Sequence, residues 1–215
     1  MSKAVLISIK PTWCELIASG KKTVEVRKTK PKLETPFKVY IYATEPRNKR
    51  DLGLCLDDGK VGLIYRWNYD YAHRHKMPIL SGKVIGEFVC DWIRREREVA
   101  DGLVDVVLRD TSCVSARELV EYANGKELYS WHISDLVIYD KPKELSELYV
   151  EGDCDCMDCK NCAWFDRGNG YNVEDDCNLA YKGVAEHKSY KPIIRPPQSW
   201  CYVEEADNEQ READI

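Results

Sequence analysis

The feature that most constrains the fold is a glycine turn followed by a strand whose side chains alternate in character. Residues 19–28 read SGKKTVEVRK. Successive side chains of a strand point to opposite faces, so Val24 and Val26 are expected to enter a core. The opposite face carries a polar row, which consists of Thr23, Glu25 and Arg27. Such a row is commonly the solvated side of an antiparallel strand, but the Arg27 guanidinium could also hold Glu25 and still offer donors to an anion or a base edge.

The residues before this turn predict a strand and a short helix. Residues 5–9, VLISI, are rich in β-branched side chains, and Pro11 suits the first turn of a helix. Apolar side chains then recur at helical spacing up to Ile17, and Gly20 is expected to end the helix. The chain therefore opens in the order strand, helix, turn, strand.

Three segments resemble the ASCH domain, the activating-signal-cointegrator homology family. ISIKPTWCELIASGKKTVEVRK matches the family's opening and its Gly-x-Lys-x-x-x-x-Arg hallmark through Gly20, Lys22 and Arg27. SWHISDLVIYDKPKEL (residues 130–145) and RPPQSWCYVEE (195–205) resemble its closing strands. The resemblance implies an α+β fold, a PUA-like β-barrel with short flanking helices and a small cysteine-rich insertion.

The resemblance also divides the chain. The predicted barrel takes residues 1–148 and 194–205, the insertion residues 149–193, and a flexible acidic tail residues 206–215. A chain that is 44% hydrophobic and 32% charged, without a long apolar run, is expected to be globular and cytoplasmic, with no membrane span. The net charge of −5 argues against bulk binding of duplex nucleic acid. A local basic run remains, formed by Lys21, Lys22, Arg27, Lys28, Lys30 and Lys32.

The middle of the chain predicts further strands and a helix. Strands are expected over residues 37–43, 83–93 and 104–108, and Gly86 suggests a bulge or a close approach within the second. Ser115 and Glu118 fit a capping box that opens a helix, which Gly125 closes. Residues 94–98 form a charged run after the second of these strands.

The aromatics between residues 65 and 71 have two interpretations. They fall at every second position, which favours a strand or long loop covering the barrel, while the alternative is a surface on which bases stack. These residues are Tyr65, Trp67, Tyr69 and Tyr71. Nearby His73 and His75 have no third ligand beside them in the sequence, so they are assigned to an exposed loop rather than to a metal site or a general base.

The ten cysteines divide into two groups. Those at positions 14, 55, 90 and 113 lie in apolar surroundings and are expected to be buried: Cys14, Cys55, Cys90 and Cys113. The other six lie after residue 150, in a segment with little apolar sequence, where metal binding could supply the order that burial cannot. We expect a structural zinc held by Cys159, Cys162, Cys177 and Cys201. An iron–sulfur cluster and free thiols are the alternatives, and Cys154, Cys156 and, more weakly, His187 compete for ligand places.

The two closing segments carry further candidate residues. A strand over residues 129–139 would place His132 and Ser134 on one face, where a core histidine bonded to the backbone is favoured over a catalytic one. A last strand over residues 198–204 would place Cys201 opposite a second set of candidates. That set is Gln198, Trp200 and Tyr202.

The resemblance to the ASCH family implies that the chain binds RNA or a nucleotide-like ligand. The ligand residues would be Lys22, Thr23, Glu25, Arg27, Trp131, His132, Ser134, Gln198, Trp200 and Tyr202. The alternative is a hydrolase, either a ribonuclease or an N4-acetylcytidine amidohydrolase, with Lys22 and Glu25 as catalytic residues. In the amidohydrolases a threonine nucleophile stands two residues before the arginine. Glu25 occupies that position here, which favours binding over catalysis. No protein partner is predicted.

Overall fold

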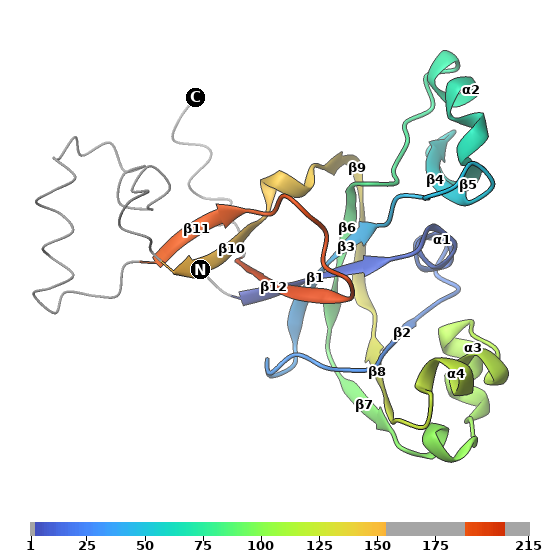
Figure 1. The fold of residues 1–215 in the computed structure, drawn as a ribbon, viewed down its shortest axis with the longest axis vertical. Coiled ribbons are helices and arrows are strands. Elements are labelled where there is room, and N and C mark those ends of the chain that lie inside the picture. The colour runs from blue at the N-terminus through green and yellow to red at the C-terminus, as the bar shows by residue number, and fades with distance from the viewer. Residues whose placement is uncertain (1–2, 154–187, 205–215) are drawn as a thin grey trace, which may run out of the picture.

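A seven-stranded sheet forms the centre of the molecule (Figure 1). The computed structural model describes residues 3–153 and 188–204. The strands follow one another across the sheet in the order β11 (Lys188–Pro192), β10 (Tyr149–Asp153), β12 (Trp200–Glu204), β1 (Lys3–Ile9), β3 (Phe37–Ala43), β6 (Val84–Cys90) and β9 (Ser134–Lys143). Together with the four α-helices found within these described ranges, this sheet confirms the α+β class. The predicted barrel is not closed, because the strands of the described residues form three separate sheets.

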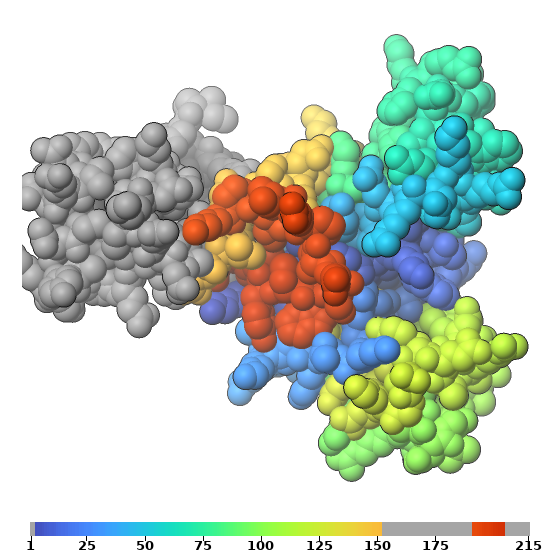
Figure 2. Space-filling view, in the orientation of Figure 1, coloured from blue at the N-terminus to red at the C-terminus, as the bar shows by residue number. Residues whose placement is uncertain are grey.

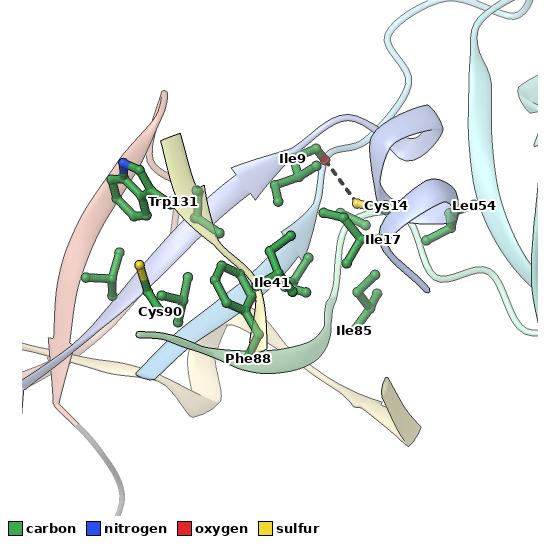
Figure 3. Packing of buried hydrophobic residues seen from close by; sticks show 14 of the residues in the cluster. Ile9, Cys14, Ile17, Ile41, Leu54, Ile85, Phe88, Cys90 and Trp131 are labelled. Atoms are coloured by element: carbon green, nitrogen blue, oxygen red, sulfur yellow. Dashed lines mark hydrogen bonds between the residues drawn. The ribbon is translucent and has the colours of Figure 1, made fainter. Parts of the chain in front are cut away.

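The central strand β1 is buried on both faces, as expected for a nearly continuous apolar run. Val5, Ile7 and Ile9 contribute to the main hydrophobic cluster, and Ala4 and Leu6 to a second cluster. Figure 3 shows part of the main cluster, where α1 (Pro11–Ala18) packs against the sheet through Cys14 and Ile17. β1 pairs in parallel with β3 and antiparallel with β12, so it joins the two ends of the chain.

A second sheet of three strands carries the polar row. Its order is β2 (Val24–Arg27), β8 (Leu128–His132) and β7 (Ile93–Glu96). The helices η2 (Glu98–Asp101), α3 (Val106–Ser112) and α4 (Ala116–Ala123) accompany it. Val24 and Val26 pack in a third hydrophobic cluster with Leu108 and Leu119, which confirms that the valines of the parity pattern enter a core.

Three strand predictions need correction. Residues 104–108 do not form a strand, because the Asp105 side chain accepts a hydrogen bond from Val107 N and thereby caps α3. The strand expected over residues 83–93 ends at Cys90, and Ile93 begins a separate strand, β7, which includes part of the charged run and pairs with β8. The strand expected over residues 129–139 is two strands, β8 and β9, separated at Ile133, and β9 continues past Pro142 to Lys143.

Two local predictions are confirmed. Ser115 and Glu118 form the capping box of α4, and the helix ends at Asn124 and Gly125, both with positive φ. Gly86 lies at a register shift between β6 and β9. A Cβ at Gly86 would lie 2.3 Å from Val137 O, so the close approach requires glycine there.

Residues 45–82, which we call the aromatic lobe, project from one end of the molecule (Figures 1 and 2). The lobe contains the hairpin β4 (Leu52–Asp57) and β5 (Lys60–Tyr65), then η1 (Arg66–Asn68) and α2 (Tyr69–Arg74). Leu54 is fully buried in the main cluster and attaches the lobe to the body beside α1. The favoured interpretation of the aromatics is therefore wrong, because Tyr65 ends a strand and the other three lie in helical turns.

The histidines of the lobe are exposed, as predicted, although they do not lie in a loop. His73 belongs to the last turn of α2, and His75 follows directly as its C-terminal cap. The prediction of buried cysteines is confirmed at positions 14, 55 and 90. It is wrong for Cys113, which is half-buried in the left-handed conformation that ends α3.

The two ends of the predicted insertion, residues 149–193, contain two strands of the main sheet. β10 and β11 pair with each other over their whole length, and Tyr149 of β10 pairs with Glu204 of β12. A short helix, η3 (Leu145–Glu147), precedes β10. Within the part of the chain that the structure describes, no helix is both long and apolar enough to cross a membrane.

Candidate functional site

The turn after α1 delivers Lys22 into the protein. Gly20 adopts φ 73°, a left-handed conformation that glycine reaches at no steric cost. The backbone N–H groups of Lys21 and Lys22 both donate to Leu16 O, which closes the end of the helix. The chain then enters β2 with Lys22 pointing inward, although its neighbour Lys21 stays exposed.

Lys22, Glu25 and Arg27 form one buried group, which we call the buried charge cluster. Lys22 Nζ lies 3.2 Å from Glu25 Oε2, and Arg27 Nε lies 3.0 Å from Glu25 Oε1. The three residues are 2%, 6% and 9% exposed, respectively. The interpretation of this face as a solvated strand surface is therefore wrong.

Backbone carbonyls complete the coordination of the two cations. Lys22 Nζ donates to Ser112 O at 2.7 Å, at the C-terminal end of α3, where the helix dipole favours a positive charge. Arg27 Nη2 donates to Ser8 O at 2.8 Å, and Arg27 Nη1 reaches Ser199 Oγ at 3.4 Å. The cluster thus ties β2 to β1, to α3 and to the segment before β12.

The cluster holds two cations against one carboxylate. Arg27 Nε is within ion-pair distance of Glu25, but its N–H is not aligned for a hydrogen bond with any described residue. Of the five N–H donors of this guanidinium, the structure pairs two with oxygen acceptors. The remaining donors and the excess positive charge suit an anionic or carbonyl-bearing ligand.

The cluster affects neighbouring ionisable groups. Burial raises the pKa of the Cys14 thiol, and the nearby Glu25 carboxylate raises it further, while Arg27 opposes the change. Burial likewise raises the pKa of Tyr122, with Arg27 lowering and Glu25 raising it. Cys14 is therefore an inert thiol that packs against α1 and donates to Ile9 O (Figure 3).

Thr23 directly precedes β2, and it is held in place by hydrogen bonds of its backbone. Its N–H donates to Thr111 O, and its carbonyl accepts from Ile133 N. Thr23 is half-buried and connects α3 with the junction between β8 and β9. The backbone at Thr23 therefore positions Lys22 and Glu25 on either side of it.

The predicted aromatic residues differ in their access to solvent. Trp131 is fully buried in the main cluster, so its ring offers no stacking surface. Trp200 and Tyr202 are half-buried, and their rings lie 5.4 Å apart at a steep angle. Trp200 Nε1 donates to Thr29 Oγ1, and Tyr202 Oη accepts from Lys32 N, so both side chains hold the loop after β2.

His132 and Ser134 do not share a face, because they lie in β8 and β9 on either side of the break at Ile133. His132 Nδ1 lies 2.6 Å from Asp91 Oδ1, and its ring stacks on Trp92 with centroids 4.8 Å apart. The prediction of a core histidine bonded to backbone is therefore wrong. Ser134 Oγ donates to Val89 O at 2.9 Å.

The segment before β12 contributes through residues that were not predicted. Gln198 is exposed in a bend, so it lies outside the strand expected to begin there. Its neighbour Pro197 accepts a hydrogen bond from Ser8 Oγ, and Ser199 O accepts from Ser8 N. Ser8 and Ser199 are the partners of Arg27 that sequence reasoning missed, because Ser8 accepts through its backbone carbonyl and Ser199 lies far away in the chain.

The predicted metal ligands lie mostly outside the described residues. This holds for Cys159, Cys162 and Cys177, and for the competing Cys154, Cys156 and His187. Cys201 lies in β12 against the second hydrophobic cluster, and burial raises the pKa of its thiol to about 11. Trp200 and Tyr202 face the main cluster instead, as the alternation of the strand predicts. Across residues 3–153 and 188–204, no group of three or more metal-binding side chains comes together.

Comparison with known proteins identifies a family and a fold. The family model for the ASCH domain matches residues 7–167. The crystal structure of ASCH from Zymomonas mobilis is 16% identical, with a TM-score of 0.50 over 98% of this chain and 94% of that one. A tyrosine-to-phenylalanine mutant of that protein is 16% identical, with a TM-score of 0.47 over 100% of this chain and 99% of that one. No curated protein matches the chain.

Proposed function

The chain belongs to the ASCH domain family, and from this premise we propose that its buried charge cluster recognises RNA or a nucleotide-like ligand. The observation that carries the proposal is the excess of positive charge, with Lys22 and Arg27 sharing the one carboxylate of Glu25. Buried charges are costly unless they are paired, so a phosphate or a base carbonyl would complete the cluster. Arg27 is the most exposed member and would make the contact.

Trp200 and Tyr202 would border this ligand. They come from β12, whose preceding segment touches Arg27 through Ser199. Both rings are half-buried, so they retain area that a base could cover. The loop that they hold contains Lys30 and Lys32, which are exposed and would meet the backbone of an RNA strand.

A hydrolase is the second candidate, since Lys22 and Glu25 lie in contact and could exchange a proton. Lys22 is 2% exposed, however, and its ammonium group already contacts Ser112 O and Glu25. A proton donor enclosed in this way supports a binding role better than a catalytic one.

The test compares variants on one panel of single-stranded RNA oligomers and N4-acylated cytidines. Arg27→Lys keeps the charge but removes the planar fork, so we expect a loss of affinity of about tenfold or more. Lys21→Ala, at the exposed neighbour of Lys22, is the matched control and should bind like the wild type with a slightly shallower salt dependence. Circular dichroism checks that each variant is folded.

Glu25→Gln distinguishes the two candidates, because the amide keeps the shape of the side chain and removes its charge. A binding module should retain most of its affinity, whereas a hydrolase that depends on this carboxylate should lose turnover and still bind. If the wild type neither binds nor cleaves any member of the panel, the nucleic-acid proposal is wrong.

A structural zinc is a separate proposal, based on the spacing of Cys159, Cys162 and Cys177 and on Cys201 in β12. Elemental analysis of protein purified without added metal should find about one zinc per chain. An unchanged zinc content in the Cys159→Ser, Cys162→Ser double variant would refute this ligand set, and a brown colour would favour an iron–sulfur cluster.

A further inference from the structure

The aromatic lobe exposes several large rings. Trp67 is 64%, Tyr71 50% and Tyr65 46% exposed. Tyr65 and Trp67 meet edge to face with ring centroids 5.7 Å apart, and Tyr71 contacts the ring of His75 at 4.1 Å. Tyr71 and His75 are four residues apart, which places them on one face of α2 and its C-terminal cap. Trp67 lies in the preceding η1, so the segment exposes two pairs of rings.

The lobe does not need these rings for its own packing. Its buried apolar side chains include Leu54, Ala72 and Leu80, which are at most 2% exposed, and Leu54 and Leu80 pack in the main cluster. Tyr69 supplies the inward aromatic, since its ring packs directly over Gly53. The exposed rings are thus additional to the core, and an exposed cluster of this kind commonly marks a binding surface.

The lobe is also rich in positive charge, although Arg66 and Arg74 each donate a hydrogen bond to a backbone carbonyl of the lobe. Residues 45–82 contain seven lysine and arginine side chains against five acidic ones, in a chain whose net charge is −5. All seven are exposed, and within the described residues none of them forms an ion pair. They are Arg47, Lys49, Arg50, Lys60, Arg66, Arg74 and Lys76. One of the five carboxylates, Asp51, is occupied by the backbone N–H groups of Arg47 and Asn48.

Backbone contacts bring part of this charge to the rings. Trp67 N donates to Lys49 O, and Arg66 N donates to Asp51 O, so the segment with Lys49 and Arg50 runs beside η1. Arg74 lies in the same short helix as Tyr71. The surface thus combines aromatic faces with neighbouring cations, the combination on which unpaired bases and their phosphates bind.

We propose that the aromatic lobe binds single-stranded RNA, with Trp67 and Tyr71 stacking on bases and with Lys49, Arg50 and Arg74 contacting phosphates. An apolar protein partner would bury these cations without an anion, at a high desolvation cost. Stacking requires unpaired bases, which a duplex does not offer. This inference rests on the proposed function for the identity of the ligand, but it concerns a separate surface. In Figure 1, α1 lies between the lobe and β2, which carries the buried charge cluster.

The test uses a labelled single-stranded RNA of roughly 12 nucleotides, a length within the range that such surfaces cover. Trp67→Ala combined with Tyr71→Ala should weaken its binding about tenfold to a hundredfold. Trp67→Phe keeps a ring and should retain most of the affinity. Lys49→Ala with Arg50→Ala should make the slope of the logarithm of the binding constant against the logarithm of the salt concentration shallower, by about 0.7 for each lost phosphate contact. Arg117→Ala with Lys126→Ala removes the same charge from α4 and its C-terminal turn, and this control should change neither quantity.

Two comparisons separate this inference from the proposed function. A mononucleotide, which the buried charge cluster alone can hold, should bind equally to the wild type and the Trp67→Ala, Tyr71→Ala variant. A duplex of the same sequence should bind weakly, and with the same affinity to the wild type and to the Trp67→Ala, Tyr71→Ala variant. If the wild type binds the oligomer and the ring variant binds it equally well, the lobe is not an RNA surface, although the proposed function stands. If the wild type binds no RNA, both fail.

Discussion

The buried charge cluster and the aromatic lobe use positive charge in opposite ways. In the cluster, Lys22 and Arg27 are almost fully buried, and each contacts Glu25 and a backbone carbonyl. In the lobe, seven exposed cations form no ion pair with a described residue. The stability of the fold therefore depends on the charges of the cluster, whereas removing the exposed cations of the lobe should leave the free energy of unfolding nearly unchanged. The charged side chains of the cluster are held in fixed positions by their contacts. The exposed cationic side chains of the lobe can instead adjust to the shape of a flexible RNA strand, as proposed above.

The largest expected effect is on the cluster. Glu25→Ala leaves two buried cations without their carboxylate, so the free energy of unfolding should fall by about 3–5 kcal/mol. Guanidinium unfolding followed by circular dichroism measures this. The control is Lys49→Ala with Arg50→Ala in the lobe, which should stay within about 0.5 kcal/mol of the wild type. A loss below about 1 kcal/mol for Glu25→Ala would show that the cluster is hydrated and that the contrast between the two regions is false.

A smaller effect should distinguish the packing of the main sheet from that of the lobe. Gly86→Ala places a Cβ against Val137 O, a backbone atom that cannot easily move, and should destabilise the protein by about 1–3 kcal/mol. Gly62 of β5 has no heavy atom within 4 Å of the corresponding position. Gly62→Ala should therefore leave thermal unfolding almost unchanged. Equal losses in the two variants would contradict this difference in packing.

The smallest effect concerns the pair formed by exposed Asp91 and half-buried His132. Partial burial pushes the pKa of the Asp91 carboxyl up, but the hydrogen bond from His132 and backbone hydrogen bonds outweigh this and hold the pKa below its ordinary value. The pair therefore stabilises the fold above the ordinary aspartate pKa of about 3.9, and this stability is lost as the pH falls through the lowered value.

His132→Ala should move the pKa of Asp91 back up, which NMR titration of its side-chain carboxyl carbon would detect. Trp92→Leu removes the stacked ring but keeps the hydrogen bond, so it should leave the pKa of Asp91 low. If the pKa of Asp91 is unchanged in the His132→Ala variant, backbone donors alone account for its lowered value.

The sequence predicted those parts of the fold that depend on local pattern. Alternation in β2, the capping box at Ser115 and the constrained Gly86 each follow from neighbouring residues, and each is confirmed. Residues 104–108 were mistaken for a strand because their apolar content fits either state, and the capping role of Asp105 decided for a helix. The break at Ile133 depends on two different sheets and has no local signal.

The sequence indicated which polar side chains form the site, but not the contacts that bury them. The spacing of Lys22, Glu25 and Arg27 indicated a polar group, while its burial arises from α3 and from the segment before β12. These contacts join residues far apart in the chain, and the contact with α3 ends on a backbone oxygen. The aromatics of the lobe fall at every second position, which imitates a strand, and the change from β5 to helical turns after Tyr65 was not visible in that pattern.

The position of β12 next to β1 has a consequence for the synthesis of the protein. Lys3 pairs with Glu204, so β1 gains its second neighbour only after the chain as far as Glu204 has emerged from the ribosome. Until then β1 keeps one open edge, and Arg27 lacks its contact with Ser199. Pairing over such a sequence separation is slow to form, and a nascent chain that stops before Trp200 exposes an apolar strand edge on which other chains can aggregate.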